Sequence, residues 1–159
     1  KGRWIDDALA SMVQSNRIGS EVLFARGATA CTDVTGFGLL GHLVEMARPS
    51  EVDVELDLNA LPLLDGALDC VRNGIFSSLQ PQNVRLRRAI RADSNGGRES
   101  ELLPLIFDPQ TAGGLLATVP EAEAEGCVDA LREAGYSTAT VVGRILPQSN
   151  HLEPITLLG

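Results

Sequence analysis

Apolar residues recur at helical spacing over much of the chain. In the first such stretch they fall on Trp4, Ile5, Ala8, Leu9, Met12 and Val13. Helices are predicted, in chain order, for residues 4–15, 18–26, 36–47, 61–71, 80–92, 102–107 and 121–134. Gly27, Pro49 and Gly74 are the residue types that end helices, and they stand just after the second, third and fourth of them.

Apolar and acidic residues alternate strictly over residues 51–58, which predicts a strand with one buried face. Further strands are predicted for residues 28–33, 115–119, 137–145 and 152–158, the last as an edge strand. The polar face of the alternating strand carries Glu51, Asp53, Glu55 and Asp57. We expect this row to be a solvated face that discourages edge pairing, rather than a cation site.

Predicted helices and strands alternate along the chain, so the fold class is α/β, or layered α+β, with a mixed β-sheet flanked by helices. With 159 residues the chain is long enough for one domain with its own core. Aromatic residues make up only 4%, so that core must consist of aliphatic side chains. Residues 93–98 combine turn formers with glycines and predict a mobile loop.

The net charge of −8 argues against nucleic acid as a partner, because unspecific binding to phosphates needs a basic surface. No apolar run approaches the roughly 20 residues that cross a bilayer, so no membrane association is expected. The three cysteines are far apart and form no C-x-x-C pair, which is typical of reduced thiols in a cytoplasmic protein.

The stretch richest in chemical information is residues 28–42, ATACTDVTGFGLLGH. Asp33 stands at the end of a predicted strand, and Gly36, Gly38 and Gly41 follow at the start of a helix. Such an arrangement can present a carboxylate and bare backbone amides to a cation bound to phosphates. An Asp at this place is also a common N-cap, and both readings stay open.

The same glycines match the dinucleotide-binding pattern G-x-G-x-x-G, and Asp57 follows at about the required separation of 20 residues. Val34 and Thr35 stand between the strand and the first glycine, which speaks against that interpretation. His42 is expected to be a packing or capping residue rather than a base.

A second motif, FDPQTAGGLL at residues 107–116, is either a well-specified turn or a loop that faces an anion or another domain. A third feature is the group Arg85, Arg87, Arg88 and Arg91. Its members are expected on a solvated helix face, with phosphate contact as the alternative.

Residues 32–42 and 108–116 together resemble the two signatures of the selenophosphate synthetase (selenide, water dikinase) family. Ser is usual in the family where this chain has Ala112, and Gly143-Arg144 also fits. The resemblance covers most of the chain and implies the fold of the C-terminal domain of aminoimidazole ribonucleotide synthetase. It divides the chain into a helical lead-in, residues 1–26, and that domain, residues 27–159.

In that family a preceding N-terminal domain carries most of the ATP site, the catalytic Cys or selenocysteine, a Lys and further metal-binding Asp residues. The resemblance therefore implies that this chain holds no catalytic residue of its own and is inactive alone. Asp33 would join the other carboxylates around Mg²⁺. Thr32, Gly36 and Gly38 would shape the ATP-binding wall, with Asn83 and the loop 108–114 as weaker candidates, and Cys31 would not be the nucleophile.

The resemblance implies that the complete protein is a cytoplasmic homodimer that makes selenophosphate from selenide and ATP, releasing AMP and phosphate. Mg²⁺ would be its cofactor. Two alternatives stay open: a free-standing binding or regulatory module of the same fold, and a related ATP-dependent enzyme of purine or thiamine synthesis.

Overall fold

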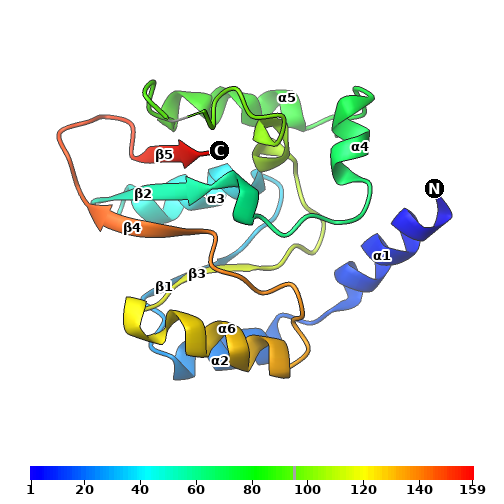
Figure 1. Ribbon diagram of the computed structural model, residues 1–159, viewed down its shortest axis with the longest axis horizontal. Helices are drawn as coiled ribbons and strands as arrows, with labels where there is room; N and C mark the ends of the chain where they lie inside the picture. The colour runs from blue at the N-terminus through cyan, green and yellow to red at the C-terminus, as the bar shows by residue number, and fades with distance from the viewer. Residues whose placement is uncertain (95) are drawn as a thin grey trace.

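The computed structural model describes residues 1–94 and 96–159, and it contains two small sheets with helices around them (Figure 1). Strands β1 (Ala30–Asp33) and β3 (Leu115–Thr118) form an antiparallel pair. The other sheet has the order β4–β2–β5, from β4 (Gly143–Pro147), β2 (Val52–Asp57) and β5 (Ile155–Leu158). Because β4 runs antiparallel and β5 parallel to β2, this sheet is mixed, as predicted.

The helices lie in two groups around the sheets. Helices α2 (Arg17–Ala25) and α6 (Ala124–Glu133) pack on each other beside the β1–β3 pair, and α3 (Gly38–Ala47) lies behind β2 (Figure 1). Helices α4 (Ala67–Arg72) and α5 (Gln80–Asn83) lie on the far side of β5, followed by the 3₁₀ helices η2 (Val84–Ala89) and η3 (Leu103–Phe107). Two further 3₁₀ helices, η1 (Leu58–Ala60) and η4 (Glu121–Glu123), are short.

The core lies between α3 and the mixed sheet. The apolar face of α3 meets the apolar side chains that alternate along β2, and β5 completes the layer. The largest fully buried side chains of this core are Leu40, Leu56, Leu58, Ile106, Ile155 and Leu157. Burial of such aliphatic side chains stabilises a fold by about 1.5–3 kcal/mol each, so this layer sets the position of α3.

Helix α1 (Gly2–Val13) projects from the rest of the molecule and buries none of its residues (Figure 1). Its Trp4 ring lies against Gly66, where a Cβ atom would come within 2.2 Å of the indole. Arg3 also forms an exposed ion pair with Asp65, at 3.5 Å. The helix is therefore held at its first turn by the contact with Gly66, and at its C-terminal end by Gln14, whose side chain donates to the Gly135 carbonyl at 3.0 Å.

Two predicted elements begin six residues later than expected. The helix predicted for residues 61–71 starts only at Ala67, because Gly66 adopts a left-handed conformation with φ +83° under the Trp4 ring. The strand predicted for residues 137–145 starts only at Gly143. Its contact with β2 ends at the hydrogen bond from the Asp57 amide to the Val142 carbonyl, at 2.8 Å, because β2 then gives way to η1. Residues 137–141 are in no strand of the described structure.

The acidic row on β2 is not uniformly solvated, which corrects the expectation from its pattern. Asp53 is 3% exposed, and its carboxylate accepts hydrogen bonds from the Arg91 guanidinium and the Ser149 amide. The loop 93–98 is also more closely packed than predicted: Ser94 and Gly97 are buried, and the Ser94 hydroxyl accepts the Leu157 amide hydrogen at 3.1 Å. Asn95 lies outside the described residues.

Candidate functional site

Asp33 is the last residue of β1, opposite Leu115 of β3, and its side chain is exposed. Within the described residues, its carboxylate meets no hydrogen-bond donor and no cation of the protein. It lines an open depression together with Asn16, Arg17, Ser20, Cys31, Thr32 and Leu115. The carboxylate is therefore free to bind a ligand, as a strand-end position allows.

The two sequence motifs meet directly beside Asp33. The Val34 amide donates to the Gly114 carbonyl at 2.9 Å, and the Gln110 amide donates to the Thr35 carbonyl at 3.0 Å. The structure thus brings residues 33–38 and 108–114 together into one wall, although about seventy residues of chain separate them.

Gly113 makes this approach of the two motifs possible. A Cβ atom at Gly113 would lie 2.0 Å from the Val34 carbonyl oxygen, a separation that no side chain can adopt. Asn16, at the start of α2, donates from its side chain to the Gly113 carbonyl at 3.0 Å. The second motif is therefore a tightly packed loop whose contact with the first motif requires glycine.

Gly38 and Gly36, two predicted wall residues, have different surroundings. Gly38 adopts φ +68°, and a Cβ atom there would lie 2.9 Å from the Ile106 carbonyl oxygen, so this glycine lets α3 start against the end of η3. Gly36 is exposed, and apart from its two chain neighbours no described residue has an atom within 4 Å of the position of its missing Cβ. Open space in front of Gly36 leaves room for a ligand to approach the backbone.

Asn83 is buried and connects the two motif segments from behind. Its side-chain nitrogen donates to the Gly36 carbonyl at 2.9 Å and to the Phe107 carbonyl at 3.0 Å. Thr32 is half-buried on β1, and its hydroxyl donates to the Asp33 carbonyl at 3.2 Å. Both residues lie at the predicted wall. The Asn83 side-chain nitrogen and the Thr32 hydroxyl already bond to backbone carbonyls of the two motifs.

The electrostatics of the site concern two acids. Burial raises the pKa of the Cys31 thiol, and the neighbouring Asp33 carboxylate raises it further. Cys31 therefore stays in the weakly nucleophilic thiol form at neutral pH. Burial also raises the pKa of Asp108, and a hydrogen bond from Gln110 opposes that rise only in part.

Gln110 belongs to the loop 108–114, a weaker candidate for this wall, but the sequence did not predict the hydrogen bonds that Gln110 and His42 form there. The Gln110 side chain donates to the Asp108 carboxylate, and the Gln110 backbone amide donates to the Thr35 carbonyl. His42 was expected to be a packing or capping residue. In the structure its Nε2 accepts a hydrogen bond from the Thr35 backbone amide, at 3.0 Å. Both residues lie inside the two sequence motifs, but the motifs do not indicate which groups these residues bond to.

The arginine group divides in the structure. Arg91 is engaged with Asp53, with the Ser149 hydroxyl and with the Glu153 carbonyl. Arg85, Arg87 and Arg88 are exposed on η2, as a solvated face would be. Arg91 is thus a structural residue rather than a phosphate ligand.

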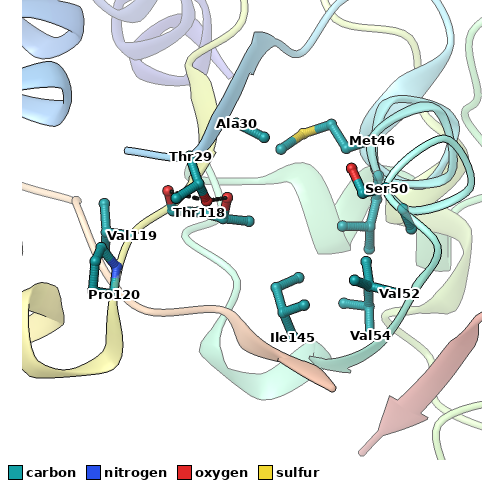
Figure 2. A pocket seen from close by; sticks show the side chains of 12 residues that line it. Thr29, Ala30, Met46, Ser50, Val52, Val54, Thr118, Val119, Pro120 and Ile145 are labelled. Atoms are coloured by element: carbon teal, nitrogen blue, oxygen red, sulfur yellow. Dashed lines mark hydrogen bonds between the residues drawn. The ribbon is translucent and has the colours of Figure 1, made fainter. Parts of the chain in front are cut away.

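A second hollow, of about 330 Å³, lies between the two sheets (Figure 2). Val52, Val54 and Ile145 line one side of it and Met46 the other, while the hydroxyls of Thr29 and Thr118 bond to each other at 2.8 Å. None of its lining residues carries a charge. This pocket therefore lacks the groups that a phosphate or a metal ion requires.

Over residues 1–94 and 96–159, no three His, Cys, Asp or Glu residues come together in a way that could hold a metal ion. Asp33 therefore offers a single carboxylate ligand.

None of the described helices is both long and apolar enough to cross a membrane.

Comparison with known proteins identifies relatives for nearly the whole chain. The family model for the C-terminal domain of AIR synthase related protein matches residues 6–152. Selenide, water dikinase from Geobacter metallireducens is 39% identical over 147 residues, which are 92% of this chain and 42% of that protein. Selenide, water dikinase from Caldanaerobacter subterraneus subsp. tengcongensis is 38% identical, over 87% of this chain and 40% of its own length.

Selenide, water dikinase 2 of Peptoclostridium acidaminophilum is 32% identical, over 89% of this chain. The chain spans about 40% of the length of these relatives. Among solved structures, the hydrogenase maturation protein HypE superposes with a TM-score of 0.65 at 17% identity, over 92% of this chain and 39% of that one. HypE has also been solved in complex with ATP, with the same TM-score.

The HypE superposition confirms the predicted fold class, and the selenide, water dikinase relatives confirm the resemblance carried by the two motifs. The family model covers far more than half of the chain. This chain belongs to the family of AIR synthase related proteins and represents their C-terminal domain.

Proposed function

We propose that this chain is the C-terminal part of a selenide, water dikinase, an enzyme that converts selenide, ATP and water into selenophosphate, AMP and phosphate. The observation that carries the proposal is the free carboxylate of Asp33 at the wall where the two motifs meet. The identity to selenide, water dikinases over most of this chain supports it. So does the solved ATP complex of HypE, which shares the fold.

Asp33 would be the one residue of this chain that binds Mg²⁺. A carboxylate oxygen is the ligand type that Mg²⁺ prefers, and one or two carboxylates with substrate phosphates commonly complete its coordination. The exposed Asp33 side chain, which has no hydrogen-bond or ion-pair partner among the described residues, fits that role. When bound, the ion would neutralise charge on the phosphates during phosphoryl transfer.

The wall beside Asp33 would hold the phosphates in place. Gly36 leaves open space in front of its backbone, and α3 begins two residues later, so the positive end of the helix dipole lies close by. Gly38, Thr32 and Asn83 keep this wall in shape through their backbone contacts. Positioning of this kind is the main contribution that a protein makes to phosphoryl transfer.

Replacement of Asp33 by Asn in the complete protein tests the proposal. Asn keeps the size of the side chain but loses its charge, so we expect selenophosphate formation to fall by more than about 100-fold, with a higher Mg²⁺ requirement. Selenophosphate is measured by ³¹P NMR in reactions with selenide and ATP.

Asp129→Asn is the matched control, because Asp129 is exposed on α6 and lies outside the motifs. It should retain the activity of the unmodified protein. An Asp33→Asn protein as active as this control would remove Asp33 from the proposed metal site. Absence of selenophosphate formation by the unmodified complete protein would overturn the function itself.

A further inference from the structure

His42 is a buried polar residue in the middle of the first motif, and the proposed function leaves it without a role. Its side chain is 7% exposed, on the first turns of α3. Its Nε2 lies 3.0 Å from the Thr35 amide nitrogen and 3.1 Å from the Thr35 hydroxyl oxygen. Because the amide is the donor, Nε2 carries a lone pair and the ring proton of neutral His42 is on Nδ1.

The proton on Nδ1 has no good partner. Among the described residues, no hydrogen-bond acceptor reaches Nδ1, and the nearest carboxylate oxygen is that of Glu45 at 3.5 Å. A buried N–H group without a hydrogen bond costs free energy, which an apolar side chain of similar size would avoid. Packing alone therefore does not account for histidine here, and the acceptor at Nε2 is the feature that an apolar side chain lacks.

Thr35 is the junction of the site. Its carbonyl accepts the amide hydrogens of Gly38 and of Gln110, each at 3.0 Å, so it joins the start of α3 to the second motif. On one side of Thr35, the Val34 amide donates to the Gly114 carbonyl. On the other side, the Gly36 carbonyl accepts a hydrogen bond from the Asn83 side chain. His42 holds the Thr35 amide, in the middle of this segment.

We infer that His42 is a positioning residue: by accepting the Thr35 amide hydrogen at Nε2, it sets the path of the backbone between Asp33 and α3. The inference rests on the proposed function, since it concerns how Asp33 and Gly36 are presented to magnesium and phosphate. His42 itself is buried and does not line the depression beside Asp33, so it acts on the site through the Thr35 backbone.

Two substitutions of His42 distinguish the two ring nitrogens. The amide group of Gln extends as far as Nε2, so its oxygen can accept the Thr35 hydrogen. The amide group of Asn extends only as far as Nδ1, so His42→Asn leaves that hydrogen without an acceptor. In the complete protein we expect His42→Asn to lower kcat by about tenfold or more and to raise the Mg²⁺ requirement, whereas His42→Gln stays within about threefold of the parent.

A second readout does not depend on activity. Hydrogen exchange of the Thr35 amide, followed by NMR, should become about tenfold faster in His42→Asn and stay slow in His42→Gln, as loss of one hydrogen bond implies. His151→Asn is the control, because His151 is exposed outside both motifs, and it should change neither quantity.

Equal kcat values for His42→Asn and His42→Gln, or a Thr35 amide that exchanges equally slowly in both, would overturn the inference. A parent protein that makes no selenophosphate would instead overturn the proposed function, and the exchange of Thr35 would still decide the role of His42. The two failures are thus separate.

Discussion

Asp53 shows how one side chain is stabilised against its own burial. Its side chain is only 5% exposed, and burial acts to raise its pKa. The hydrogen bonds from Ser149 and Arg91 outweigh that effect and hold the pKa of Asp53 below its ordinary value of 3.8. The charged pair joins β2 to the segment after η2. Hydrogen bonds from Ser149 to Asp53 and from Arg91 to the Glu153 carbonyl connect both to the segment before β5.

Replacement of Asp53 by Asn should lower the free energy of unfolding by about 3 kcal/mol near neutral pH, because it leaves the Arg91 guanidinium without its counter-charge. A lowered pKa in the folded state stabilises the protein above the unfolded pKa, and this contribution is lost as the pH falls through the folded value. The difference between the parent chain and Asp53→Asn should therefore shrink below pH 3.8. Urea unfolding followed by circular dichroism at a series of pH values measures both effects.

Glu55→Gln is the matched control on the same strand. Glu55 pairs with Arg144, whose side chain is 71% exposed, and an ion pair with an exposed partner contributes at most about 1 kcal/mol. If Asp53→Asn were no more destabilising than Glu55→Gln, the buried pair would not have the structural role assigned to it.

For single residues, the sequence predicted which positions are important better than it predicted which groups those residues bond to. Asp33 could be singled out because a strand end followed by glycines is a local pattern. The burial of Asp53 could not be predicted, because Arg91 and Ser149 come from distant segments and alternation shows only that Asp53 faces away from Val52 and Val54. The bonds of Asn83 and His42 likewise depend on tertiary contacts.

Among the elements, the two loops beside Asp33 behave as one unit. The first connects β1 to α3, the second leads from η3 into β3, and the hydrogen bonds of Val34 and Thr35 hold them together. Because β1 and β3 are paired with each other, a shift of either loop moves the end of the β1–β3 sheet, where Asp33 lies.

Gly113→Ala should separate the two loops. Its new Cβ would meet the Val34 carbonyl oxygen at 2.0 Å, a contact between backbone segments that cannot move without breaking hydrogen bonds. We expect a loss of about 1–3 kcal/mol in the free energy of unfolding, measured by urea titration.

The neighbouring Gly114→Ala is the control, since no atom lies within 4 Å of its missing Cβ. It should change the stability by less than about 0.5 kcal/mol. If the two alanine variants were equally stable, the close approach of the motifs would be wrong.

The sequence predicted most elements, because their apolar spacing is local. The helices at 18–26 and 36–47 and the strand at 51–58 are present with ends shifted by up to two residues. The strand at 137–145 is mostly wrong, because propensity for β structure does not supply a partner, and β2 offers one only from Val142 onward. The helix at 61–71 is shortened by the contact of Gly66 with Trp4, which the sequence pattern does not reveal.

For the whole molecule, the important point is what one chain contributes to the proposed site. Asp33 is one carboxylate, and no cluster of three acidic, histidine or cysteine side chains surrounds it in the described structure. Mg²⁺ keeps several waters or phosphate oxygens unless more protein ligands are supplied, so one carboxylate holds it weakly.

We therefore expect the 159-residue chain by itself to catalyse no turnover of ATP and to show no saturable Mg²⁺ binding at millimolar concentrations. Release of AMP and phosphate, measured by chromatography with and without selenide, tests the first part, and titration calorimetry tests the second. The complete protein, assayed under the same conditions, is the control. Turnover by the chain alone would show that its active site needs no further domain.

Trp4 is the only tryptophan of the chain, and it lies on the helix that buries none of its residues. The intrinsic fluorescence of the protein therefore reports on the contact between α1 and the Gly66 turn, and not on the aliphatic core behind β2. Loss of that contact would change the emission while both sheets stay intact. Any polypeptide that covers α1 would change the emission in the same way, so the single indole is a built-in probe of what binds to this helix.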